Sequence, residues 1–194
     1  PGTPDFNRFL TARNRSVIRG FNDVSIAISS LFRTVNAVKH PELVQAIQDW
    51  FNELHDENNL MKQNLEAHIA TIKVDESDPF FSSTEFSPFR FKSVQLNFNN
   101  QNTMRFYKHI FEMNNLLTQM YKFNSLGQLP VSDYNVMAHN IIRSLNMYIE
   151  RVKKTLNVSR RVKGSYSPDE FIEKVKQYKS VQAYIAAELS GKRQ

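Results

Sequence analysis

Hydrophobic and polar positions repeat with a helical spacing along most of the chain. Apolar side chains recur every three or four residues over about 22–38, 41–73, 103–124, 132–156 and 167–189. Such spacing places them on one face of an amphipathic helix. The pattern therefore predicts five helices and a mainly α-helical protein, whose first two helices form a hairpin. The face of 41–73 has two candidate partners, the preceding helix and a second copy of itself.

One short stretch has a different period. The segment FKSVQLNF, residues 91–98, alternates apolar and polar positions, which is typical of a half-buried β-strand. A single strand leaves backbone N–H and C=O groups unpaired, so the same segment of a second molecule is the expected partner, antiparallel about a twofold axis. The apolar residues that would form the dimer core are Val94, Leu96 and Phe98.

The polar face of this paired ribbon predicts contact with DNA. A two-stranded ribbon fits the major groove, where amide side chains can donate to and accept from base edges. The predicted base-contacting residues are Ser93, Gln95 and Asn97. Cations beside the strand and at the start of the next helix are candidates for phosphate contact. These are Arg90, Lys92, Arg105 and Lys108. In the alternative interpretation, Gln95 and Asn97 are ordinary solvent-facing residues of a ribbon that only mediates dimerisation.

Charge is distributed unevenly along the chain, whose net charge is +6. Residues 1–88 carry 8 Lys or Arg against 12 Asp or Glu, and residues 89–194 carry 17 against 7. A basic segment of this size is typical of proteins that bind a polyanion, most often nucleic acid. The alternative is a solvated surface that is basic without a partner.

The sequence lacks the residues that several kinds of functional site require. The chain has no cysteine, which excludes disulfides and thiolate zinc sites, and His109 and His139 lie on different predicted helices. Carboxylates in the basic half are scattered, and no glycine-rich phosphate loop is present. No apolar run approaches the length of a membrane span. We therefore expect a soluble protein that is not an enzyme and has no metal, cofactor or membrane partner.

The order strand, helix, loop, helix over residues 91–156 resembles the ribbon-helix-helix domain of the MetJ/Arc repressor class. The resemblance implies base contacts by Ser93, Gln95 and Asn97 and a phosphate anchor at Ser132. The whole chain, with FKSVQLNFNNQNTMRFYKHIFEMNNLL, is similar to AcaB-type regulators of conjugative plasmids and integrative elements. That similarity implies a bacterial, cytoplasmic activator of transfer genes. Asp133 departs from the pattern, because its charge would repel a phosphate at this helix N-terminus.

The expected organisation has four parts. Residues 1–74 form an N-terminal helical region, 75–89 a linker or arm, 90–157 the ribbon-helix-helix core, and 158–194 a basic tail with a C-terminal helix. The outer helices would wrap the core, extend the homodimer or contact RNA polymerase. Two other functions remain open: an accessory DNA-processing protein of the relaxosome type, and a dimeric interaction protein that does not bind DNA.

Overall fold

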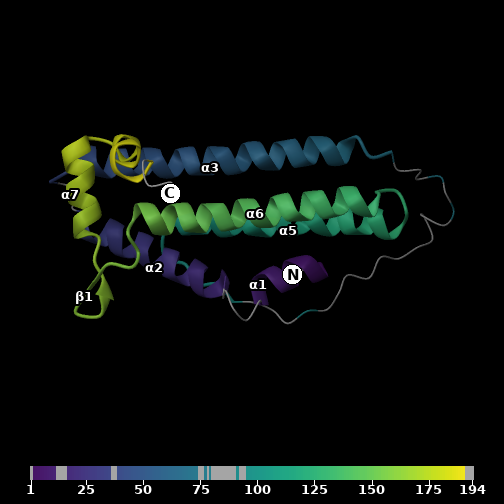
Figure 1. Ribbon diagram of the computed structural model, residues 1–194, viewed down its shortest axis with the longest axis horizontal. Coiled ribbons are helices and arrows are strands. Elements are labelled where there is room, and N and C mark those ends of the chain that lie inside the picture. Colours follow the sequence, from purple (N-terminus) through teal and green to yellow (C-terminus); the bar gives the residue numbers. More distant parts are fainter. Residues whose placement is uncertain are drawn as a thin grey trace. The chain divides into compact units, whose positions relative to one another are not determined.

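The chain is mainly helical, as predicted. The computed structural model describes residues 2–11, 17–35, 39–73, 77, 79, 91 and 95–190. Its helices are α1 (Pro4–Thr11), α2 (Val17–Thr34), α3 (Pro41–Ala70), α5 (Gln101–Ser125), α6 (Val131–Thr155), α7 (Asp169–Tyr178), α8 (Val181–Tyr184) and the π-helix η1 (Ile185–Leu189). Two short strands, β1 (Arg161–Val162) and β2 (Ser165–Tyr166), form the only sheet in this part of the chain (Figure 1).

Helices α3, α5 and α6 begin and end within about three residues of their predicted limits, whereas α2 starts at Val17 and ends at Thr34 instead of spanning the predicted 22–38. Helix α3 starts at Pro41, because proline at the first helical position has no N–H to leave unpaired. Helix α5 begins two residues before the predicted cap Thr103, and the Asn100 carboxamide accepts the Asn102 N–H at 2.9 Å instead. Gly127, at a φ of 74°, follows α5 and adopts the left-handed conformation that favours glycine at a helix end.

The predicted strand over 91–98 is wrong where the structure describes it. Residues 95–99 form neither helix nor strand, and they are hydrogen-bonded to α2 of the same chain. The Ser25 hydroxyl donates to the Asn97 carbonyl at 3.0 Å, and the Ser29 hydroxyl donates to the Asn99 side-chain oxygen. These bonds hold the segment on its own chain.

The predicted ribbon-helix-helix fold class is therefore also wrong. Seven α-helices span the described residues, far more than a small core with one strand per chain would contain. The observed strands pair with each other within one chain, with Arg161 opposite Tyr166 and Val162 opposite Ser165. The two strands that the structure describes are therefore paired without a second molecule.

The chain divides into two compact units, each built from separated segments. Unit 1 contains residues 1–18, 58–95 and 107–146, and unit 2 contains residues 19–57, 96–106 and 147–194. In unit 1, α1 is attached by two long-range hydrogen bonds. The Gly2 N–H donates to Asn114 Oδ1 at 2.8 Å, and the Tyr134 hydroxyl donates to Asp5 Oδ2 at 2.7 Å. The buried apolar side chains of unit 1 include Phe6, Phe9, Met113, Leu117, Met137 and Ile141.

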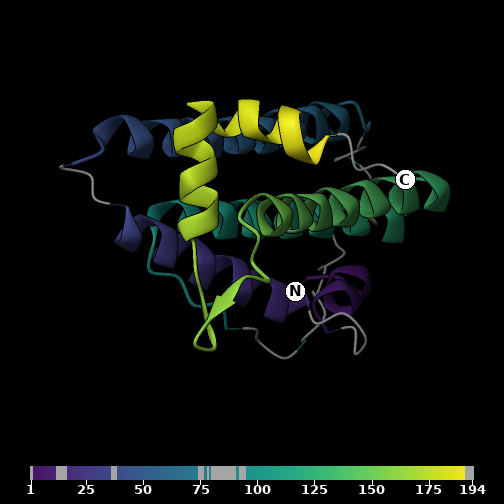
Figure 2. The ribbon, with the colours of Figure 1, turned by 60° about the vertical axis from the view of Figure 1, so that its left-hand side comes forward.

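Unit 2 has an aromatic core. The rings of Phe106 and Tyr148 stack with centroids 3.8 Å apart, and Phe21 meets Phe106 edge-on at 5.7 Å. Trp50 and Phe51 of α3 are also fully buried in this unit, with their ring centroids 4.8 Å apart. Helix α7 runs across the direction of the first part of α3 in both ribbon views (Figures 1 and 2).

The predicted C-terminal helix over 167–189 is broken in the structure. Lys179 has a φ of 65°, a left-handed conformation that ends α7 after Tyr178. The Ser180 hydroxyl then accepts the Ala183 N–H at 3.1 Å and starts α8. The sequence pattern missed this break because the apolar spacing continues through it.

Candidate nucleic-acid interface

The predicted DNA-reading residues lie in a segment that is not a strand. Gln95 and Asn97 are exposed, Leu96 is half-buried, and Phe98, expected in a dimer core, is 54% exposed. Arg90, Lys92, Ser93 and Val94 lie outside the described residues. The base contacts of Ser93, Gln95 and Asn97 remain predictions, but the ribbon on which they depended does not form at residues 95–98.

The other predicted phosphate contacts already have polar neighbours. Arg105 Nη1 donates to Asn52 Oδ1 at 2.8 Å. Lys108 Nζ lies 4.0 Å from Glu112 Oε1, with a side chain that remains 76% exposed. The Ser132 hydroxyl donates to Asp133 Oδ1 at 3.0 Å, so a carboxylate lies where the anchored phosphate was expected. Arg105 belongs to unit 2, and Lys108 and Ser132 belong to unit 1.

A stronger basic feature lies at the end of α6 and just after it. Residues 151–166 contain six Lys or Arg and no Asp or Glu. The six are Arg151, Lys153, Lys154, Arg160, Arg161 and Lys163. The sequence predicts a basic tail from residue 158 onward, and in the structure the first part of that tail forms the β1–β2 hairpin. We call residues 159–166 the basic hairpin.

The basic hairpin has a tight two-residue turn. Lys163 and Gly164 occupy the turn with φ values of 51° and 83°. Positive φ at both central residues is the geometry of a type I′ turn, whose twist matches that of the flanking strands. The pair Lys-Gly followed by Ser-Tyr was the sequence signal for this turn. The strands are only two residues long, so alternation could not reveal them.

The base of the hairpin is anchored while its tip is exposed. The Tyr166 hydroxyl donates to the Leu156 carbonyl at 2.8 Å, and the Ser167 N–H donates to the Arg160 carbonyl at 3.2 Å. Burial raises the pKa of Tyr166, so its hydroxyl keeps the proton that it donates. All residues from 159 to 165 are exposed. The tip is therefore presented to solvent on a fixed base.

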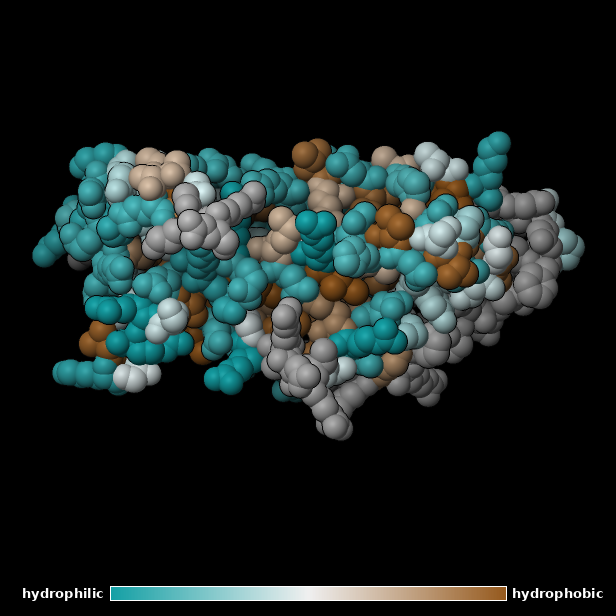
Figure 3. Space-filling model, viewed as in Figure 1, coloured by the Kyte–Doolittle hydropathy of each residue, from teal (hydrophilic) through white to brown (hydrophobic). Residues whose placement is uncertain are grey.

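The charges at the tip are only partly neutralised. Arg160 Nε lies 3.8 Å from Glu170 Oε2, and Arg161 Nη1 donates to the Val158 carbonyl, which orients its guanidinium. No carboxylate of the described residues lies within 4.0 Å of the charged nitrogens of Arg161 or Lys163. Figure 3 shows mostly hydrophilic residues at the end of the face that carries α7 and the hairpin. These cations are available to an anionic partner.

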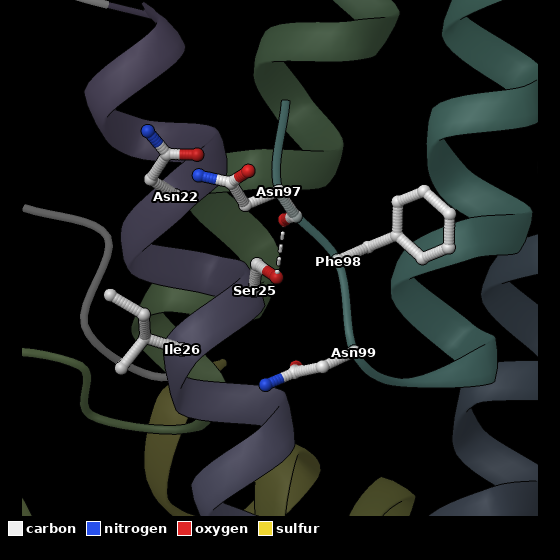
Figure 4. A pocket seen from close by; sticks show the side chains of 6 residues that line it. All are labelled: Asn22, Ser25, Ile26, Asn97, Phe98 and Asn99. Atoms are coloured by element: carbon white, nitrogen blue, oxygen red, sulfur yellow. Dashed lines mark hydrogen bonds between the residues drawn. The ribbon is translucent and has the colours of Figure 1, made fainter. Parts of the chain in front are cut away.

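A separate cleft of about 310 Å³ lies between α2 and residues 97–99 (Figure 4). Its lining is uncharged and rich in amides, and the Phe98 ring points away from Asn22 and Asn97. Its lining residues are Asn22, Ser25, Ile26, Asn97, Phe98 and Asn99. None of the described lining residues carries a charge that would attract a phosphate or a metal ion. In the described part of the chain, no three His, Asp or Glu side chains gather as metal ligands.

Comparisons with other proteins identify no relative that would indicate a function. Searches against known protein families, curated proteins and solved structures found no match to this chain. Within the described residues, no helix has both the length and the apolar character needed to cross a bilayer.

Proposed function

We propose that the protein binds double-stranded DNA through the basic hairpin. The observation that carries the proposal is a run of six cations without an acidic residue, which ends in an exposed, anchored hairpin tip. Arg161 and Lys163 sit at this tip with no carboxylate partner among the described residues. Phosphates are the natural partners of such cations, because binding releases the counterions condensed on DNA.

The proposed contacts use the phosphate backbone first. The fixed Nη1 bond of Arg161 leaves the rest of its guanidinium fork available to a phosphate, which it can bind in a bidentate manner. The Lys163 ammonium adds a flexible point charge at the turn. Arg160 shares its charge with Glu170 at 3.8 Å and contributes a weaker third contact. A hairpin of this size positions the protein on the duplex, and base recognition requires further residues.

The affinity lost with the tip charges can be worked out from counterion release. Each phosphate contact contributes about 0.9 log units of affinity for every tenfold decrease in salt concentration. Relative to about 1 M salt, one contact is therefore worth roughly 0.7 log units at about 0.15 M salt. The double variant Arg161→Gln/Lys163→Gln should therefore bind a duplex about 30-fold more weakly than the wild type under those conditions. Fluorescence anisotropy with a labelled duplex measures this change directly.

A matched control separates the hairpin from net charge. The double variant Lys122→Gln/Lys176→Gln also removes two positive charges, but from the last turns of α5 and α7. We expect its affinity for the duplex to stay within about twofold of the wild type, because nonspecific attraction beyond about 8–10 Å is screened by salt. Equal losses in the two double variants would show that the hairpin is not the DNA contact.

We further propose that this binding serves transcriptional control in the bacterial cytoplasm. The support for this role is the resemblance to AcaB-type regulators, which implies activation of transfer genes. Genome-wide mapping of bound sites tests it, and the expected sites are promoters. Sites confined to an origin of transfer would instead indicate an accessory DNA-processing protein.

A further inference from the structure

The end of α6 and the helical end of the chain enclose a second cleft in unit 2, with a volume of about 410 Å³. Among the described residues the lining includes two cations and two hydroxyls but no Asp or Glu. The lining residues are Arg151, Lys154, Thr155, Ile185, Leu189 and Ser190. This composition distinguishes the cleft from the uncharged one beside α2.

The two cations keep unused hydrogen-bonding capacity. Lys154 Nζ donates to the Leu189 carbonyl at 3.1 Å, which leaves two of the three ammonium protons for a ligand. Arg151 Nη1 donates to Glu57 Oε2 at 2.6 Å, and the remaining N–H groups of its guanidinium point in other directions. Both side chains are therefore oriented by protein contacts while they can still bind an anion.

The opposite wall combines an apolar surface with an unusual backbone. Ile185 and Leu189 are half-buried, so they can cover the organic part of a ligand. They belong to the π-helix η1, in which the Ser190 N–H donates to the Ile185 carbonyl at 2.9 Å. Such wide turns cost stability and are frequent at functional sites.

We propose that this cleft binds a small phosphorylated organic compound. The Lys154 ammonium, together with the guanidinium N–H groups of Arg151 that Glu57 leaves unpaired, suits the negative charge and the acceptor oxygens of a phosphate monoester. The apolar wall matches a small organic group, and a volume of about 410 Å³ falls in the range of small-molecule sites. The site stands on its own contacts and does not depend on DNA binding by the hairpin.

Phenyl phosphate is the probe, titrated into the full chain and followed by calorimetry. The test variant Lys154→Gln removes one charge but keeps a donor for the Leu189 carbonyl. Its matched control is Lys153→Gln, one residue away, because Lys153 Nζ pairs with Glu150 Oε1 at 3.0 Å and does not line the cleft. We expect Lys154→Gln to weaken binding about tenfold or more, and Lys153→Gln to change it by less than about twofold.

Two further measurements distinguish a small phosphate compound from a backbone phosphate of DNA as the ligand of the cleft. A saturating duplex should leave the affinity for phenyl phosphate unchanged, and so should Arg161→Gln/Lys163→Gln. Displacement of the probe by the duplex would overturn the proposal, because the cleft would then hold a backbone phosphate of DNA. Equal losses in Lys153→Gln and Lys154→Gln, or a heat no larger than that of NaCl at equal ionic strength, would also overturn it. Displacement by the duplex would extend the DNA contact from the hairpin to the end of α6, whereas the other two results would leave the proposal of duplex binding by the hairpin unaffected.

Discussion

His109 should make the stability of the fold depend on pH. It lies on α5 with 4% of its surface exposed, and neither ring nitrogen has a hydrogen-bond partner among the described residues. Burial lowers the pKa of His109 to about 4; nearby Glu112 partly opposes this shift, and Lys62 adds to it. Lys62 Nζ and Glu112 Oε1 form an ion pair at 3.3 Å. The imidazole is therefore neutral in the folded protein at pH 7.

The size and sign of the effect follow from proton linkage. An unfolded chain titrates its histidine near pH 6.5, so between that pH and about 4 the unfolded state binds a proton that the folded state excludes. The free energy of unfolding must then fall as the pH falls through this window. The loss attributable to His109 is about 2 kcal/mol at pH 5, and about 3 kcal/mol across the whole window.

Urea unfolding followed by circular dichroism at pH 7 and pH 5 measures this loss. His109→Leu removes the titrating ring and keeps an apolar side chain that favours a helix. Its free energy of unfolding should fall by about 2 kcal/mol less than that of the wild type between the two pH values. The control His139→Leu changes an exposed histidine and should keep the wild-type difference. Identical pH dependence in His109→Leu and the wild type would refute the reasoning.

Three further substitutions test individual contacts by urea unfolding. Asn102→Leu should cost about 1–3 kcal/mol, because it leaves the Gln48 carboxamide without the two bonds of 3.1 Å that join these residues. Tyr134→Phe should cost about 1–2 kcal/mol, since it removes the 2.7 Å bond to Asp5 that attaches α1. Gly164→Ala should destabilise the hairpin by about 1 kcal/mol, because alanine disfavours a φ of 83°, and it should weaken duplex binding as well. A cost near zero in any of the three would show that the named contact is not stabilising.

The long helices were predictable because their spacing is sustained. Helix α3 was expected over 41–73 and is observed over Pro41–Ala70, since thirty residues of three-and-four spacing average out local exceptions. The eight residues of α1 offer only Phe6, Phe9 and Leu10 as a pattern, which is too short to recognise without its partners. Its position depends on distant contacts such as Tyr134 to Asp5, which a local pattern does not contain.

The predicted strand over 91–98 was wrong because alternation over a few residues is found in extended irregular segments as well as in β-strands. Leu96 and Phe98 alternate with polar residues, but an irregular extended segment produces the same pattern. What decided its structure was the pair of hydroxyls on α2, Ser25 and Ser29, which are about seventy residues away in the sequence. The basic half of the chain was visible from the sequence, whereas the hairpin that presents Arg161 and Lys163 required the turn at Gly164 to be recognised.

Duplex affinity as a function of salt concentration is the most direct measurement of DNA binding by the basic hairpin. With Arg161 and Lys163 on phosphates and Arg160 as a weaker third contact, log Kd plotted against log salt should have a slope between about 1.8 and about 2.7. The variant Arg161→Gln/Lys163→Gln should lower that slope by about 1.8, and Lys122→Gln/Lys176→Gln should leave it unchanged. A wild-type slope near zero, or one that the hairpin variant shares with the wild type, would contradict the account.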